Sequence, residues 1–238
     1  MKRFWNHATV GRTDAGHTIL LDGRPLHLPG GAVVAVNSAA LAAALAEEWQ
    51  AAGGAKGGEM SFADTPLTRL AGTAQERIAP DPAPVADAIA AYGETDLLCY
   101  RADHPPELVR HQTEAWQPWL DWAALTYDAP LRMASGVMYI AQDPAALDAL
   151  RRAVRTASPD MLAGLGLAVP ALGSLVLGLA VAEGQLTGEA AYRLGALDEL
   201  YQAEAWGEDA EAAARRARIA EDIRIAARYM GLVRQTKP

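Results

Sequence analysis

The sequence has a single cysteine in 238 residues, and its first residues do not have the features of a targeting segment. One cysteine cannot form an internal disulfide, so we expect a reducing compartment. The first residues, MKRFWNHATVGRTDAGH, contain neither the apolar stretch of a secretory signal nor the arginine- and serine-rich length of a transit peptide. We therefore expect a protein that stays where it is made, which in a bacterium is the cytoplasm.

Basic residues are outnumbered by acidic ones, 21 against 29, which gives a net charge of -8. This balance argues against a nucleic-acid partner, because a phosphate backbone is bound by clustered lysine and arginine. The motifs of nucleotide and metal sites are missing as well. The stretch GGAKGGE lacks the Gly-Lys-Ser/Thr ending of a phosphate-binding loop, and neither His-Glu-x-x-His nor Cys-x-x-Cys occurs.

One long apolar run is present, from residue 161 to residue 182, and it contains no charged side chain. Its length would suffice for a membrane span. Four glycines lower its hydrophobicity, Pro170 interrupts it, and acidic Asp160 and Glu183 flank it in place of a basic cluster. The run predicts two buried helical pieces and no membrane insertion, with a membrane-associated helical protein as the alternative.

The first third of the chain is typical of an antiparallel meander followed by two helices. Strands are expected around FWNHATVG, HTILL, DGRPLHL and PGGAVVAV, with Asp22-Gly23 forming a tight turn. The next stretch, NSAALAAALAEEWQAAGG, has helical periodicity, and Asn37 or Ser38 can cap it. Trp49 falls on the apolar face of this helix, where we expect it to anchor the helix to the meander. A second helix is expected in DTPLTRLAGTAQERI, with Pro66 in its first turn.

The stretch APDPAP, residues 79–84, is the best candidate for a domain boundary. Everything after it has helical periodicity, including a helix in PELVRHQTEAWQPWLDWAALTY with Leu108, Ala115, Trp119 and Trp122 expected on one side. The sequence thus predicts an α+β protein. Residues 1–80 would form a small domain with the meander and its helices, and residues 81–238 a larger helical bundle.

The single cysteine lies in YGETDLLCYRADHP, residues 92–105, among residues that could support catalysis. One interpretation is a cysteine- or metal-dependent hydrolase that uses Cys99, His104 and Asp96. The other is structural. Cys99 continues the apolar face of the preceding helix and would be buried, while Asp96 would cap a helix or pair with Arg101. Both interpretations stay open on the residues alone, although a buried thiol is poorly activated.

Several stretches together resemble a known family. They are KRFW, LLDGRPLHLP, TPLTRLAGTA, YGETDLLCYRA, WQPWLDWA and GSLVLGLAVAEGQLTGEAAYRLGALDELYQAEAWGED. In order and spacing they are similar to the assembly chaperones of the F-type ATP synthase, specifically those that hold the alpha subunit of its catalytic head. The resemblance runs from about residue 3 to about residue 222.

This resemblance implies a binding protein and not an enzyme, and it implies that no cofactor and no metal are needed. Members of the family bind the unassembled alpha subunit and shield the surface that will later meet the beta subunit. The implied protein is a monomer, cytoplasmic in bacteria and located in the mitochondrial matrix in eukaryotic relatives. The motif LDELYQAEAWGED supplies the expected partner-binding residues, which are Glu204, Trp206, Glu208 and Asp209. An exposed aromatic residue beside acidic residues has the composition of an interface hot spot. The alternative is that these acids, at the start of a helix, only interact favourably with the helix dipole.

Overall fold

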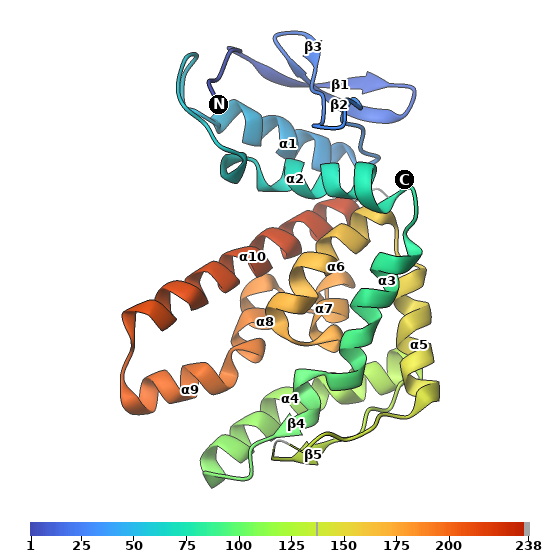
Figure 1. The fold of residues 1–238 in the computed structure, drawn as a ribbon, viewed down its shortest axis with the longest axis vertical. Coiled ribbons are helices and arrows are strands. Elements are labelled where there is room, and N and C mark those ends of the chain that lie inside the picture. The colour runs from blue at the N-terminus through green and yellow to red at the C-terminus, as the bar shows by residue number, and fades with distance from the viewer. Residues whose placement is uncertain (137, 236–238) are drawn as a thin grey trace. The chain divides into compact units, whose positions relative to one another are not determined.

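The computed structural model describes residues 1–136 and 138–235 and has the expected α+β fold, with a small three-stranded sheet followed by helices (Figure 1). The chain forms two compact units. The first consists of Met1–Pro82, Ser158–Gly164 and the residues from 228 on. The second consists of Ala83–Ala157 and Leu165–Ala227.

The sheet of the first unit is antiparallel, with β1 (Ala8–Thr13), β2 (Gly16–Leu21) and β3 (Arg24–Pro25) in sequential order. The predicted turn at Asp22-Gly23 is confirmed. Both residues have positive φ, 47° and 81°, and a two-residue hairpin turn requires this conformation.

The fourth strand expected in PGGAVVAV was wrong, because this segment forms only isolated bridges. Val36 exchanges backbone hydrogen bonds with His17 of β2, and Val34 N donates to the Leu26 carbonyl, whereas Val33 O and Ala35 N meet a side chain. The Gln75 amide accepts a hydrogen bond from the Ala35 N–H at 3.0 Å and donates one to the Val33 carbonyl at 2.8 Å. A glutamine from a later helix therefore takes the place of a strand partner at Val33 and Ala35.

Two helices follow the sheet, and α1 (Ala39–Ala51) packs against β1 and β2 while α2 (Pro66–Thr73) packs against α1 (Figure 1). Ser38 caps α1 by accepting a hydrogen bond from Leu41 N, and Pro66 occupies the first turn of α2, as predicted. A short 3-10 turn, η1 (Phe62–Asp64), precedes α2, and a π turn, η2 (Ala74–Ile78), continues it. The Glu48 carboxylate accepts hydrogen bonds from Leu67 N and Thr68 N at 2.7 and 2.9 Å, so α1 supplies the cap that the start of α2 lacks.

The ends of two later helices belong to the first unit. These are the start of α6 (Pro159–Leu172) and the end of α10 (Ala210–Arg234). Tyr229 OH donates to Asp160 Oδ1 at 2.7 Å, and Ser38 Oγ donates to the Leu232 carbonyl at 2.7 Å. Gly164 is in close contact with Met230, where an added Cβ would lie 2.3 Å from the Met230 Cγ. The two helices can pack this closely because residue 164 has no side chain.

The second unit is built mainly from helices. They are α3 (Ala83–Ala90), α4 (Pro106–Tyr127), α5 (Pro144–Arg155), α7 (Leu175–Ala182), α8 (Gly188–Gly195) and α9 (Leu197–Trp206), with the C-terminal part of α6 and most of α10. Two 3-10 turns, η3 (Ala91–Thr95) and η4 (Leu97–Cys99), follow α3. A short parallel pair joins β4 (Tyr100–Arg101) to β5 (Ala134–Ser135), so this unit contains two short strands in addition to its helices.

The apolar run at residues 161–182 forms two buried helices, as predicted, but the break lies elsewhere. Pro170 is inside α6, whereas the chain turns at Gly173, whose φ is 62°. Ser174 then caps α7 by accepting a hydrogen bond from Leu177 N. Pro170 has no N–H with which to continue the hydrogen-bond pattern of α6, and the helix ends two residues later at Leu172. Within the described ranges, no helix combines the length and apolar character that crossing a membrane requires.

Candidate partner-binding surface

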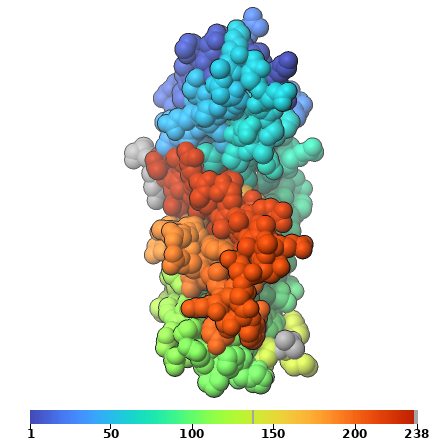
Figure 2. All heavy atoms as spheres, turned by 90° about the vertical axis from the view of Figure 1, so that its left-hand side faces the viewer, coloured from blue at the N-terminus to red at the C-terminus, as the bar shows by residue number. Residues whose placement is uncertain are grey.

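The expected partner-binding residues lie at the turn between α9 and α10, on the face of the second unit seen in Figure 2. Gly207 has a φ of 93°, a conformation that ends α9 and that residues with side chains rarely adopt. Trp206, immediately before it, is 80% exposed and is the most exposed tryptophan side chain reported for the described chain. An indole left in water at a helix end contributes little to folding and remains available for contact with a partner.

Asp209 and Glu208 have local structural partners. Asp209 Oδ2 accepts a hydrogen bond from Ala212 N at 2.9 Å, which caps the start of α10. Glu208 Oε1 accepts one from Arg216 Nη2 at 2.6 Å. The Arg216 side chain is only 8% exposed, so Glu208 neutralises a guanidinium that is largely removed from water. Interaction with the helix dipole of α10 is therefore not the only structural role of Glu208.

The acids of this turn nevertheless remain at the surface. The Glu208 side chain is 64% exposed, and Glu204 and Asp209 are exposed as well. Glu204 forms no ion pair within residues 1–136 and 138–235. We name Glu204, Trp206, Glu208 and Asp209 the Trp206 patch. It presents one aromatic group surrounded by carboxylates, which suits a partner surface with an apolar pocket and basic neighbours.

The helices that carry the Trp206 patch are joined to each other and to α4. Arg215 Nη2 donates to Glu199 Oε2 at 2.7 Å, which links α10 to α9. Gln112 Nε2 donates to Asp198 Oδ1 at 2.7 Å, which links α4 to the first turn of α9. These contacts hold the two helices at defined positions, so Trp206 is presented from an ordered turn.

The residues around the cysteine do not form a catalytic arrangement. Cys99 is fully buried at the end of η4, and burial raises the pKa of its thiol to about 12. His104 is exposed, with 80% of its side chain in solvent, and its recorded ionic contact is with Asp103. A cysteine nucleophile needs a lowered pKa and a base within hydrogen-bonding distance. The described residues also contain no group of three or more histidine, cysteine or acidic side chains placed to hold a metal ion.

Asp96 and Arg101 have structural contacts in this region. Asp96 is fully buried and accepts hydrogen bonds from Leu98 N at 3.1 Å and Val176 N at 3.0 Å, so it caps η4 and the first turn of α7. Burial raises the pKa of its carboxyl to about 6. Arg101 does not pair with Asp96 but donates to the carbonyls of Leu98 and Gln112. Its guanidinium also lies 5.2 Å from the ring centroid of Trp116.

Trp49 is 6% exposed and connects three segments of the first unit. Its Nε1 donates to Thr68 Oγ1 at 2.9 Å, and its carbonyl accepts a hydrogen bond from Trp5 Nε1 at 3.1 Å. The rings of Trp5 and Trp49 are 5.0 Å apart. Trp49 therefore anchors α1 to α2 and to the N-terminal segment that leads into the sheet.

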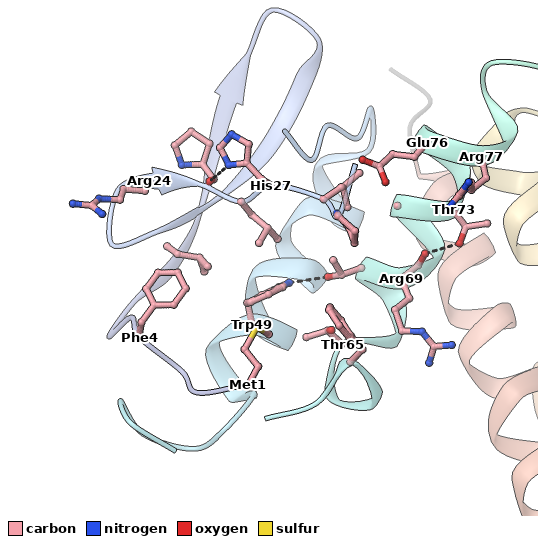
Figure 3. A pocket seen from close by; sticks show the side chains of 18 residues that line it. Met1, Phe4, Arg24, His27, Trp49, Thr65, Arg69, Thr73, Glu76 and Arg77 are labelled. Atoms are coloured by element: carbon pink, nitrogen blue, oxygen red, sulfur yellow. Dashed lines mark hydrogen bonds between the residues drawn. The ribbon is translucent and has the colours of Figure 1, made fainter. Parts of the chain in front are cut away.

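A groove beside Trp49 was not predicted from the sequence. It has a volume of about 860 Å³ and lies wholly within the first unit (Figure 3). Its lining comes from residues far apart in the chain, between Met1 and Arg77. Two features of the sequence belong to this groove, which are Phe4 beside Trp5 and a glycine, Gly72, inside a helix. Neither feature predicts a groove, because the groove forms only when the chain is folded.

Comparisons with known proteins give a consistent result. The model of the ATP12 chaperone protein family matches residues 2–124. The crystal structure of Atp12 from Paracoccus denitrificans is 42% identical in sequence, with a TM-score of 0.91 and coverage of 98% of each chain. An aspartate-to-lysine mutant of the P. denitrificans protein gives the same identity and TM-score, with 98% of this chain and 97% of the other covered. The Atu1473 protein from Agrobacterium tumefaciens, described as a candidate chaperone, is 38% identical, with a TM-score of 0.89, and the match covers 99% of this chain and 86% of the other.

The family match over residues 2–124 and the similarity to solved Atp12 over nearly the whole chain define the class as a chaperone. The chain belongs to the ATP12 chaperone family. This confirms the resemblance to the assembly chaperones of the F-type ATP synthase that the sequence motifs indicate.

Proposed function

We propose that this protein binds the unassembled alpha subunit of the F-type ATP synthase and covers the surface that later contacts the beta subunit. The supporting observation is membership of the ATP12 chaperone family over almost the full length, together with the exposed Trp206 patch. Interfaces of permanent complexes are large and apolar, and they promote aggregation when they are left uncovered. A binding protein that covers such a surface until the final partner binds prevents this aggregation.

The proposed role is binding and not catalysis, and it needs no cofactor. The protein would act as a monomer in the compartment where the alpha subunit is made, which in a bacterium is the cytoplasm. Its affinity for the alpha subunit must be lower than that of the beta subunit, because the chaperone has to dissociate during assembly. Acidic residues of the Trp206 patch would face basic groups on the alpha subunit and orient the encounter.

The test of the proposed contact is Trp206→Ala. Since Trp206 is 80% exposed, its removal should change the free energy of unfolding by no more than about 0.5 kcal/mol. At the centre of an interface, the same truncation should weaken binding of isolated alpha subunit by about 2 kcal/mol or more. The matched control is Leu125→Ala, which removes another exposed apolar side chain, 88% exposed, at the end of α4.

Titration of alpha subunit by fluorescence anisotropy, with circular dichroism as the folding check, separates the possibilities. Weaker binding by Trp206→Ala alone supports the patch. Equal binding by wild type and both variants would remove the patch from the interface and leave the chaperone role standing. Failure of wild type to bind the alpha subunit at all would reject the proposed function.

A further inference from the structure

The groove of the first unit has two walls and a floor (Figure 3). One wall is the segment that runs from Leu21 through β3 to Pro29. The opposite wall is α2 with the first turn of η2, and Trp49 of α1 lies between them. Gly72 allows the walls to approach, since a Cβ there would lie 2.9 Å from Leu28 Cδ2. The groove is open to solvent on one side and is not an enclosed cavity.

Large apolar side chains are exposed along the groove. Met1 is 59% exposed, Phe4 60% and Phe62 59%. All three line the groove together with buried Leu26 and Trp49. Scattered exposed apolar residues need no explanation, but several around one groove mark a binding surface.

The rim of the groove is basic, in a chain with a net charge of -8. Arg24 lies on the strand side, and Arg69 and Arg77 lie on the helix side (Figure 3). None of these three guanidinium groups forms an ion pair within the described part of the chain. The acid of the rim, Glu76, accepts hydrogen bonds from Gly30 N at 3.0 and 3.2 Å. The rim therefore carries three arginines and one carboxylate, which leaves a net positive charge with an arginine on each side.

The groove walls are held in place by hydrogen bonds that need no ligand. Thr68 Oγ1 donates to Glu48 Oε2 at 2.8 Å and accepts from Trp49 Nε1, which joins the floor to the helix wall. The Thr65 side chain also lines the groove and is 1% exposed. Its hydroxyl has no hydrogen-bond partner in the ranges that the structure describes. A buried hydroxyl without a partner favours an occupant that carries donors and acceptors of its own.

We propose that this groove binds an extended segment of an unassembled polypeptide, with apolar side chains in its middle and carboxylates towards both ends. An extended chain directs alternate side chains to one face, which suits an apolar floor, and its backbone supplies donors and acceptors. Carboxylates on both sides match arginines on both walls, and guanidinium groups bind carboxylates well. The inference rests on the proposed chaperone function for its choice of partner, but the groove can be tested without that partner.

The open shape and the two separated basic rims favour a peptide over a fatty acid. A fatty acid carries one carboxylate and is best held by an enclosed cavity. A peptide of about eight residues can lie across an open groove and place charges at both rims. Oleate therefore serves as the competing ligand in the test.

The experiment measures fluorescence anisotropy of fluorescein-labelled synthetic peptides with capped ends. The first peptide alternates leucine and serine and has glutamate at both ends. The second replaces the glutamates with lysines, and the third replaces the leucines with serines. We expect the first peptide to bind at least about tenfold more tightly than the other two. Equal binding of all three, or binding of oleate with no binding of the first peptide, would overturn the proposal.

Protein variants locate the binding. Phe4→Asp with Phe62→Asp removes apolar groups from the groove, and Arg69→Glu with Arg77→Glu reverses charge on one rim. Each pair should weaken binding of the first peptide about tenfold or more. The matched controls are Leu125→Asp and Arg218→Glu, which make the same changes at exposed positions of the second unit and should bind normally. If the groove variants do not fold, a photoreactive leucine in the peptide should still cross-link wild-type protein within the groove, and cross-links only elsewhere would overturn the proposal.

The same variants separate this inference from the proposed function. Where wild type captures the alpha subunit but does not bind the first peptide, the groove inference fails and the chaperone role stands. Where wild type binds the first peptide in the groove but does not capture the alpha subunit, the groove inference stands and the proposed function fails.

Discussion

Replacing Glu208 with lysine should destabilise the second unit, because Glu208 is the partner of a buried arginine. Glu208 Oε1 lies 2.6 Å from Arg216 Nη2, and the Arg216 side chain is 8% exposed. The substitution removes this contact and places a second positive charge beside the first. An acid that served only the dipole of α10 would contribute about 0.3–1 kcal/mol.

The magnitude follows from the exposure of the two side chains. A hydrogen bond between charged groups contributes about 1.5–3 kcal/mol. The Glu208 side chain is 64% exposed, so water screens its half of the pair and can partly solvate the guanidinium once the acid is gone. We expect Glu208→Gln to lower the free energy of unfolding by about 1–2 kcal/mol. Repulsion between like charges should increase the loss in Glu208→Lys to about 2–4 kcal/mol.

The assay is urea unfolding followed by circular dichroism, for wild type and both variants at low and high salt. Glu204→Lys is the matched control, since Glu204 is an exposed acid on α9 without an ion pair among the described residues, and it should stay within about 0.5 kcal/mol of wild type. High salt should reduce the difference between Glu208→Gln and Glu208→Lys. A Glu208→Lys protein as stable as Glu204→Lys would refute the assigned role of the Arg216 contact.

Three further outcomes follow from buried groups. Cys99→Ser should cost about 1–3 kcal/mol of stability, because a hydroxyl replaces a fully buried thiol. Native wild-type Cys99, whose pKa is raised to about 12, should be alkylated slowly at neutral pH, and alkylation as fast as in the urea-unfolded chain would contradict its burial. Trp49→Arg should prevent stable folding of the first unit, since it places a charge on a 6% exposed position and breaks the bond to Thr68, and a soluble variant with an unchanged melting temperature would contradict this. The pKa of Asp96 is raised from 3.8 to about 6 by burial, so the folded state binds its proton more tightly than the unfolded state does, and the stabilisation present below pH 3.8 is lost as the pH rises to about 6. Unfolding free energies of wild type and Asp96→Asn between these pH values should show this loss only in wild type, and parallel curves would contradict the assignment.

Local chemistry was sufficient to predict part of the fold. Asp22-Gly23 and Ser38 were identified because a tight turn needs positive φ and a helix start needs an acceptor. Burial of Cys99 was also expected, although for a different reason. The helix before it ends at Ala90, and two 3-10 turns bring Cys99 into the core instead of a continuous helical face.

Contacts between distant residues were not predictable from the pattern. On α4 the predicted stripe placed Trp119 and Trp122 inward, whereas the structure buries Trp116 fully and leaves those two half-buried. Gln112 lies on the buried face because its side chain accepts from Ala102 N and donates to Asp198. A polar residue that is satisfied by partners 10 and 86 positions away looks like a surface residue in the sequence.

The same limit applies to the sites. The composition of LDELYQAEAWGED indicated a surface patch, and Trp206 and its acids are exposed. The pairing of Glu208 with Arg216 reaches across the turn into α10, and periodicity alone did not indicate that Arg216 is buried. The groove depends on the approach of β3 to α2, which is a tertiary arrangement with no local signature.

The proposed chaperone function can be tested most directly by titration of the purified protein with isolated ATP synthase alpha subunit and, separately, with the assembled catalytic head. Light scattering after size-exclusion chromatography gives the mass of each complex. We expect a complex of one chaperone with one free alpha subunit, no complex with the assembled head, and release of the chaperone when beta subunit is added. Binding to the assembled head as tight as to free alpha subunit, or no binding to free alpha subunit, would contradict the proposed function.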